Sequence, residues 1–123
     1  ELQKVKLHFV QSVLLDETQL HPKMAGFVKR YRQRYALGPE APIPSPTGTV
    51  HAYDLTQLLA NAVTQAKSTD RAAIRSALES LPAHSGLLRE YKPAFTKTRH
   101  EALDASLLHL AHFDERGWVV GSE

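Results

Sequence analysis

The chain has 123 residues, of which 42% are hydrophobic and 23% are charged, a composition that is ordinary for one globular domain. The net charge is only +2 and no cysteine is present, which excludes disulfides, thiolate nucleophiles and thiolate metal sites. The one cationic cluster, from Lys29 to Arg34, falls in a predicted helix as a solvated face, so we expect no nucleic-acid partner.

No apolar run approaches the ~20 residues that span a bilayer. The sequence begins at Glu1 with strand-like residues, and no signal peptide is visible. We therefore expect a processed product or a piece of a longer protein.

The first predicted element is a strand over residues 5–15, where apolar residues alternate with a period of two and the second half is apolar on both sides. Burial on both faces is typical of an inner strand of an α/β sheet. A polar connection follows, and Pro22 then begins a predicted helix that ends near Leu37.

Residues 38–48 include four prolines and two glycines, which predicts an irregular loop. The next helix is predicted over residues 48–66, with one buried face. The apolar residues of this face recur at helical spacing: Leu55, Leu58, Leu59, Ala62, Val63 and Ala66. A shorter helix follows, capped within residues 68–70 and closed by Pro82, so the two helices are expected to form an antiparallel hairpin.

The remainder is predicted as short strands and turns. Residues 86–91 are expected to form a strand, residues 92–96 a loop, and residues 97–104 either a turn or one helical turn. Strands over residues 107–113 and 118–120 flank a tight turn at residues 114–117, which predicts a terminal β-hairpin. The fold class is therefore α/β.

The order of these motifs resembles the carboxy-terminal third of the type I periplasmic solute-binding proteins, the branched-chain amino acid binding family of ABC importers. The matching residues are Phe27-Val28-Lys29-Arg30-Tyr31, Ala52-Tyr53-Asp54-Leu55, Ser68-Thr69-Asp70-Arg71, Ala77-Leu78-Glu79, Gly86, Arg99-His100-Glu101-Ala102-Leu103, Asp114 and Gly117-Trp118. Each motif is short, and it is their order over about 110 residues that carries the resemblance.

The resemblance implies a fragment of a fold with two lobes, between which a ligand is enclosed by hinge closure. Residues 1–15 would belong to the second lobe and residues 16–104 to the first. Residues 105–123 would form the return crossing and a hairpin of the second lobe. The crossings would lie at residues 16–18 and 105–106, with Asp16 and Glu17 as hinge residues.

The resemblance also implies a ligand-binding position at Gly48, Thr49, Val50 and His51, where the family's first lobe presents loop residues to the ligand. His51 can bond a carboxylate or carbonyl in either protonation state, and a surface histidine beside a helix start is the alternative. A helix start also offers unpaired amides.

Structural roles are expected for Tyr53 and Asp54. A carboxylate such as Asp54 in the first turn of a helix is favoured by the helix dipole. Arg99 and His100, with Glu101 and Asp104, are expected to lock the crossing by hydrogen bonds, with a ligand role as the alternative.

Neither a metal site nor catalysis is predicted, and no cofactor is expected. His109 and His112 lie three residues apart in a predicted strand, so they face opposite sides and cannot share an ion. No Gly-x-Ser-x-Gly or phosphate-loop pattern is present.

We therefore expect a periplasmic solute-binding component, not an enzyme, whose partners are an amino-acid-like solute and a membrane permease. Two alternatives stay open: a ligand-sensing domain of a signalling protein with the same fold, and an unrelated small α/β enzyme. If the chain is a fragment, its strand edges at residues 5–15 and 107–113 would be unpaired, which predicts a strand-swapped or edge-paired homo-oligomer.

Overall fold

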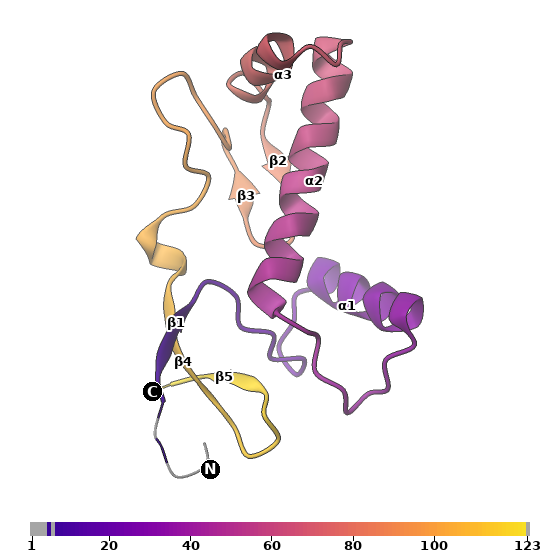
Figure 1. The fold of residues 1–123 in the computed structure, drawn as a ribbon, viewed down its shortest axis with the longest axis vertical. Helices are drawn as coiled ribbons and strands as arrows, with labels where there is room; N and C mark the ends of the chain where they lie inside the picture. The colour runs from indigo at the N-terminus through magenta and orange to yellow at the C-terminus, as the bar shows by residue number, and fades with distance from the viewer. Residues whose placement is uncertain (1–4, 6, 123) are drawn as a thin grey trace. The chain divides into compact units, whose positions relative to one another are not determined.

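The computed structural model describes residue 5 and residues 7–122, and it has a mixed α/β architecture with three α-helices and two antiparallel sheets (Figure 1). In chain order the elements are β1 (Phe9–Gln11), α1 (Pro22–Tyr35), α2 (Pro46–Ala66), α3 (Arg71–Leu78), β2 (His84–Ser85), β3 (Glu90–Tyr91), the 3₁₀ turn η2 (Ala105–Leu107), β4 (His109–Phe113) and β5 (Val119–Gly121).

The chain divides into two compact units. The first holds the chain up to Thr49 and again from Leu108, and the second spans Val50–Leu107. The chain passes between them within α2 and directly after η2. The resemblance implied divisions after residues 15 and 104 instead.

The first unit contains a three-stranded antiparallel sheet in the order β1-β4-β5. β1 pairs with β4 through Val10 opposite Leu110, and β4 pairs with β5 through His112 opposite Val120. The sequence predicted a free edge at residues 107–113, and this is wrong, because β4 is the central strand. The predicted inner strand is also wrong, because β1 pairs on one side only among the described residues.

The two faces of this sheet differ in burial. Ala111 is completely buried on the face that also carries the Phe9 and Phe113 rings, whose centroids lie 4.9 Å apart, although Phe113 itself is 54% exposed. On the opposite face Val10 is 61% exposed and Leu110 is 50% exposed. Of the strand predicted over residues 5–15, only Phe9–Gln11 is strand. Its second half, residues 11–15, is buried or half-buried throughout, as predicted. Residue 6 lies outside the described part of the chain.

α1 belongs to the first unit, and its Met24, Phe27 and Val28 are all buried. Its predicted extent is confirmed at the start, where Pro22 occupies the first turn and His21 is the N-cap. The helix ends at Ala36, which takes the left-handed conformation with φ of 52° and bonds back to Arg32.

The second unit is built on the predicted hairpin of α2 and α3, and Figure 1 shows α3 folded back beside α2. Asp70 caps α3 by accepting the Ala73 amide at 2.9 Å. The helices share a core with the segment after β3, formed by Leu58, Ala62, Ala77, Leu81, Tyr91 and Ala94. Burial of a side chain such as Leu58 contributes about 1.5–3 kcal/mol.

The predicted buried face of α2 is only partly correct. The buried residues recur every four positions, at Val50, Asp54, Leu58 and Ala62. Leu55 is 52% exposed and Leu59 is 48% exposed. The side of α2 that is buried is therefore narrower than the apolar stripe predicted from its sequence.

The strand predicted over residues 86–91 is replaced by a small hairpin. β2 and β3 pair through His84 opposite Tyr91, and the residues between them turn, with the Gly86 amide donating to the Arg89 carbonyl at 2.9 Å. Of residues 97–104, for which a turn or one helical turn was predicted, residues 97–98 form a turn between the bridged Thr96 and Arg99, and residues 100–104 are irregular. Among the described residues no helix is apolar enough over sufficient length to cross a membrane.

Candidate functional site

The first turn of α2 is the position at which the resemblance places a ligand. The helix begins at Pro46, two residues before the predicted start. Ser45 precedes it with φ of 45°, and its carbonyl accepts the Thr49 amide at 2.9 Å. Thr47 donates its hydroxyl to Gln11, and Thr49 donates its hydroxyl to the Pro44 carbonyl at 2.9 Å. The turn is therefore held from both sides by its own side chains.

This turn has hydrogen-bond donors that the helix does not use. Pro46 has no amide hydrogen, while the amides of Thr47 and Gly48 have no carbonyl four residues earlier within the helix. Such amides, together with the helix dipole, favour a carboxylate or another anionic oxygen.

The four predicted ligand residues do not lie in a loop before the helix, as the resemblance implied, but inside its first two turns. Gly48 is exposed, whereas Thr49 and His51 are half-buried. Val50 is completely buried, so its side chain belongs to the core and cannot reach a ligand. The physical reason is the i, i+4 spacing of Val50 with Asp54 and Leu58, which places it on the covered side of α2.

A cavity of about 210 Å³ lies in the first unit, immediately before this turn. Its walls come from three segments of the chain: Leu15 and Glu17, then Pro42, Ile43, Pro44, Ser45 and Pro46, then Phe113, Gly117, Trp118 and Val119. The walls are mainly apolar and aromatic, with Glu17 as the one charged side chain. An apolar cavity with a few polar groups is the usual form of a small-molecule site.

Glu17, predicted as a hinge residue, is the acidic group of this cavity. Its Oε1 accepts Arg32 Nη2 at 2.6 Å, and Arg32 also donates to the Gly38 carbonyl. Among the described residues the buried Nε of Arg32 has no hydrogen-bond partner. The ion pair joins the polar connection before α1 to the end of α1, so Glu17 has a structural contact as well as a place in the cavity wall.

Sequence reasoning missed the cavity because its walls are far apart in the chain. The only available signal was the local composition: the single tryptophan, Trp118, and the prolines of residues 42–46. Neither signal indicates that the two segments meet.

Asp16, in the first predicted crossing, and Asp104, directly before the second, make the same local contact. Asp16 Oδ1 accepts both the amide and the hydroxyl of Thr18, at 2.9 and 2.6 Å. Asp104 Oδ1 accepts the amide of Ser106 at 2.9 Å and also its hydroxyl. The Thr18 hydroxyl bond lowers the pKa of Asp16, and the Arg89 bond at 2.7 Å, with those from Ser106, lowers the pKa of Asp104.

Asp54 and Tyr53, predicted as structural residues, lie in the third turn of α2 and not in the first. The helix dipole therefore does not explain Asp54. Its carboxylate is 1% exposed and accepts the amides of Leu87 and Leu88 at 2.7 and 3.0 Å and the Tyr91 hydroxyl at 2.9 Å. Tyr53 is half-buried in the same turn.

Arg99 and His100 are exposed and make contacts within the second unit. Arg99 donates to the carbonyls of Pro93, at 2.6 Å, and Glu101, which closes the loop between them. His100 Nε2 lies 3.0 Å from Glu79 Oε1, which also accepts Arg75 at 2.9 Å. The Arg75 bond, followed by that of His100, lowers the pKa of Glu79. These contacts all lie within the second unit, and the locking of the crossing by Arg99 and His100 stays a prediction.

A larger cavity, of about 570 Å³, lies in the second unit beside β3 and residues 99–105. Of its charged lining residues, Arg89 is paired with Asp104 and Arg99 bonds backbone carbonyls. Its lining includes none of the residues at the start of α2, where the resemblance places a ligand.

Within the part of the chain that the structure describes, no group of three or more histidine or acidic side chains is arranged to hold a metal ion. His109 and His112 lie in β4 and point to opposite faces of the sheet, as predicted from their spacing. His112 is instead close to His8, with ring centroids 5.8 Å apart.

Comparisons of the chain with protein-family models, curated proteins and solved structures find no match. The resemblance to the solute-binding proteins therefore rests on the residues quoted above.

Proposed function

We propose that this chain is part of the periplasmic solute-binding component of an ABC importer, acting on amino acids or related small carboxylates and amides without covalent chemistry. One observation carries the proposal. β1 and the β4–β5 hairpin come from opposite ends of the chain and share one sheet, while residues 50–107 form a separate compact unit. The resemblance likewise implies a path that leaves one lobe and returns to it, with the crossings after residues 15 and 104.

Contacts between the quoted motifs support the proposal. Asp54 and Gly86 belong to different motifs, and a Cβ at Gly86 would lie 2.5 Å from Asp54 Oδ2. Glu79 and His100 also belong to different motifs and lie 3.0 Å apart. These motifs are far apart in the sequence, but their residues touch in the fold. Contact between them is a physical reason for one chain to carry both motifs.

Exposed apolar surface supports the fragment part of the proposal. Val10 and Leu110 are exposed side by side on the sheet of the first unit, and Leu55 and Leu59 are exposed on one side of α2. Apolar patches of this kind mark surfaces that further polypeptide covers.

In this proposal the amides at the start of α2 bind the carboxylate or carbonyl of the solute, and His51 adds a hydrogen bond. Closure of the two lobes selects the bound solute, and the closed form docks on the membrane permease.

The test uses the product of the complete reading frame, titrated calorimetrically with the common amino acids, their amides and small dicarboxylates. At least one solute should bind, and His51→Ala should weaken its binding about fivefold, as expected for one lost hydrogen bond. His109→Ala, an exposed histidine on β4, is the control and should leave affinity unchanged. Absence of binding by the whole panel would contradict the proposed function, and unchanged affinity of His51→Ala alone would remove that residue from the site.

A further inference from the structure

Positive charge is concentrated on α1. The helix holds five of the fifteen Lys and Arg residues of the chain and none of its thirteen Asp and Glu residues. The rest of the chain has ten basic and thirteen acidic residues, a net charge of −3. The small net charge of the protein therefore conceals a strongly cationic helix.

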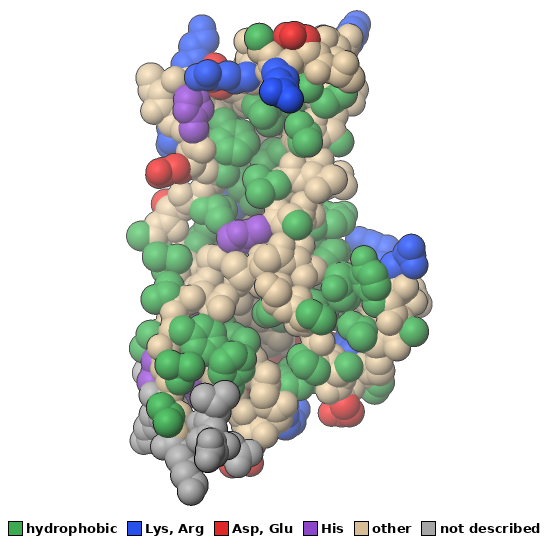
Figure 2. Space-filling model, viewed as in Figure 1, with side chains coloured by type: hydrophobic (Ala, Val, Ile, Leu, Met, Phe, Trp, Pro, Cys, Tyr) green, Lys and Arg blue, Asp and Glu red, His purple; other side chains and the backbone are tan. Residues whose placement is uncertain are grey.

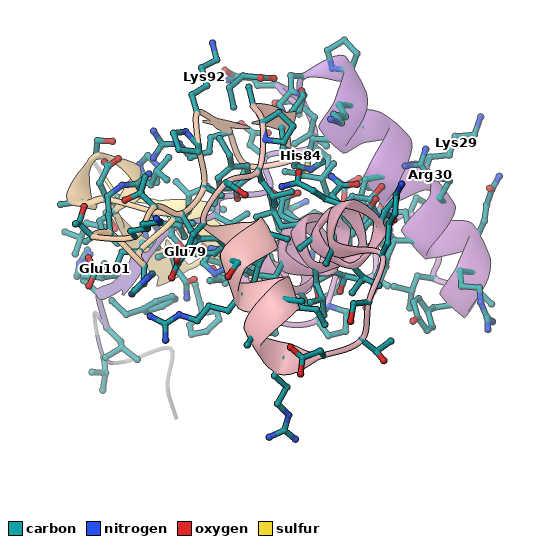
Figure 3. The ribbon with its side chains drawn as sticks, turned by 90° about the horizontal axis from the view of Figure 1, so that it is seen from above. Lys29, Arg30, Glu79, His84, Lys92 and Glu101 are labelled. Atoms are coloured by element: carbon teal, nitrogen blue, oxygen red, sulfur yellow. The ribbon has the colours of Figure 1, made fainter. Side chains whose placement is uncertain are left out.

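Most of these cations are not used inside the protein. Arg32 is paired with Glu17, but within the described chain no carboxylate is paired with Lys29, Arg30 or Arg34, and all three are exposed. Figure 2 shows Lys and Arg side chains gathered over α1, and Figure 3 shows Lys29 and Arg30 projecting from this helix. Met24, Phe27 and Val28 are buried on one side of the helix. At about 100° per residue, Lys29 and Arg30 lie on the side away from them, so these two cations are directed outward. Arg34 and Tyr35 lie at the last turn, near the side of Phe27 and Val28.

An exposed aromatic ring accompanies the cations. Tyr35 is 59% exposed, its ring centroid lies 4.6 Å from that of Tyr31, and the Arg34 guanidinium lies 5.8 Å from its centroid. Tyrosine has an apolar ring and a polar tip, which suits the boundary between water and lipid headgroups. Neither of the two cavities described above includes an α1 residue, so this surface is the outer side of a helix and not a pocket.

We propose that the cationic surface of α1 docks on an anionic lipid bilayer. This surface is formed by Lys29 and Arg30, with Arg34 and Tyr35 at the carboxy-terminal end of the helix. The contact is electrostatic and peripheral, because Met24, Phe27 and Val28 are buried and are not available for insertion. It is independent of solute binding and goes beyond the proposed function.

Co-sedimentation with lipid vesicles tests the proposal. The 123-residue protein should bind vesicles that contain about 30% phosphatidylglycerol in phosphatidylcholine, and should not bind phosphatidylcholine alone. Because each cation near an anionic surface contributes about fivefold in partitioning, Lys29→Glu with Arg30→Glu should reduce binding roughly thirtyfold or more. About 1 M salt should release the native protein, since it shortens the Debye length to about 3 Å.

The matched control is Arg71→Glu with Lys97→Glu, which makes the same change in net charge at exposed positions of the second unit. This control variant should retain most of the binding to the anionic vesicles. Circular dichroism should show native helix content in the control variant and in the α1 variant. Equal loss in both variants would overturn the proposal, because net charge and not α1 would then decide binding. It would also be overturned if the protein ignored the anionic vesicles, or bound only poly-glutamate or an oligonucleotide. If the reversed variant does not fold, Lys29→Gln with Arg30→Gln gives the same comparison with a smaller expected loss.

Discussion

A single buried carboxylate, that of Asp54, joins the middle of α2 to the turn between β2 and β3. Both oxygens are used, by the two amides of Leu87 and Leu88 and by the Tyr91 hydroxyl. An ionised group without such partners would be very costly to bury, so the three bonds account for its place in the core. Burial, followed by the charge of Asp54, raises the pKa of Tyr91.

Truncation of this carboxylate should be much more costly than loss of one of its donors. Asp54→Ala leaves two buried amides and a hydroxyl unsatisfied and should destabilise the protein by about 3 kcal/mol or more. Tyr91→Phe removes one donor and should cost about 1–2 kcal/mol. Urea unfolding followed by circular dichroism measures both, and equal losses would show that the amide bonds contribute little.

Gly86 is required by the same contact. A Cβ at this position would lie 2.5 Å from both Asp54 Oδ2 and Tyr91 Cε2. We expect Gly86→Ala to destabilise the protein by about 2–4 kcal/mol, because the carboxylate would have to leave its amides.

Gly38→Ala is the matched control for this substitution, since nothing lies within 4 Å of a Cβ there. It should change the free energy of unfolding by less than about 0.5 kcal/mol. Similar urea midpoints for the two variants would contradict the steric explanation.

At the scale of elements, the β4–β5 hairpin depends on its turn. Asp114 Oδ1 accepts the amides of Arg116 and Trp118 at 2.9 and 2.8 Å, and Gly117 has φ of 79°, which glycine adopts without strain. The Trp118 amide bond is the main cause that lowers the pKa of Asp114, with smaller contributions from Arg116.

The turn should therefore contribute an acid-sensitive part of the stability. Because the folded pKa of Asp114 lies below its unfolded value, its contribution is complete above about pH 5 and is lost as pH falls below about 4. Asp114→Asn should lower the urea midpoint at neutral pH. The midpoint of this variant should also decrease less than that of the native protein as the pH is lowered. Glu115→Gln removes the same charge from the next residue and should leave the acid dependence unchanged. An equally steep acid dependence in Asp114→Asn would show that this carboxylate is not responsible.

At the scale of the whole molecule, the distribution of apolar surface is unusual. Val10 and Leu110 are exposed on one face of the three-stranded sheet, although each is adjacent to a buried residue or a ring contact on the other face. Leu55 and Leu59 are similarly exposed on α2. An isolated chain with such faces is expected to bury them against another copy.

We therefore predict that the 123-residue protein self-associates in sedimentation velocity at micromolar concentration. Leu110→Lys should shift the distribution toward the monomer, because it places a charge in the middle of the exposed sheet face. Thr56→Lys adds the same charge at an exposed position of α2 and should not have this effect. A native protein that is monomeric throughout would contradict the prediction.

Much of the local structure could be predicted from the sequence. Three local signals act over only a few residues: the spacing of Met24, Phe27 and Val28, the cap at Asp70 and the turn at Gly117. α1, α3 and the terminal hairpin can therefore be predicted from short stretches of sequence. The ion pair of Glu79 with His100 and the walls of the cavity could not be predicted, since their members are separated by many residues.

What the sequence by itself determined was therefore the type and order of the helices and of the terminal hairpin. Only the tertiary structure decided that β4 is a central strand, that residues 84–91 form two short strands, and that the start of α2 borders an apolar cavity. The physical reason is that periodicity and caps are properties of neighbouring residues. Strand pairing, the covered side of a helix and the burial of Asp54 depend instead on which distant segments supply the partner atoms.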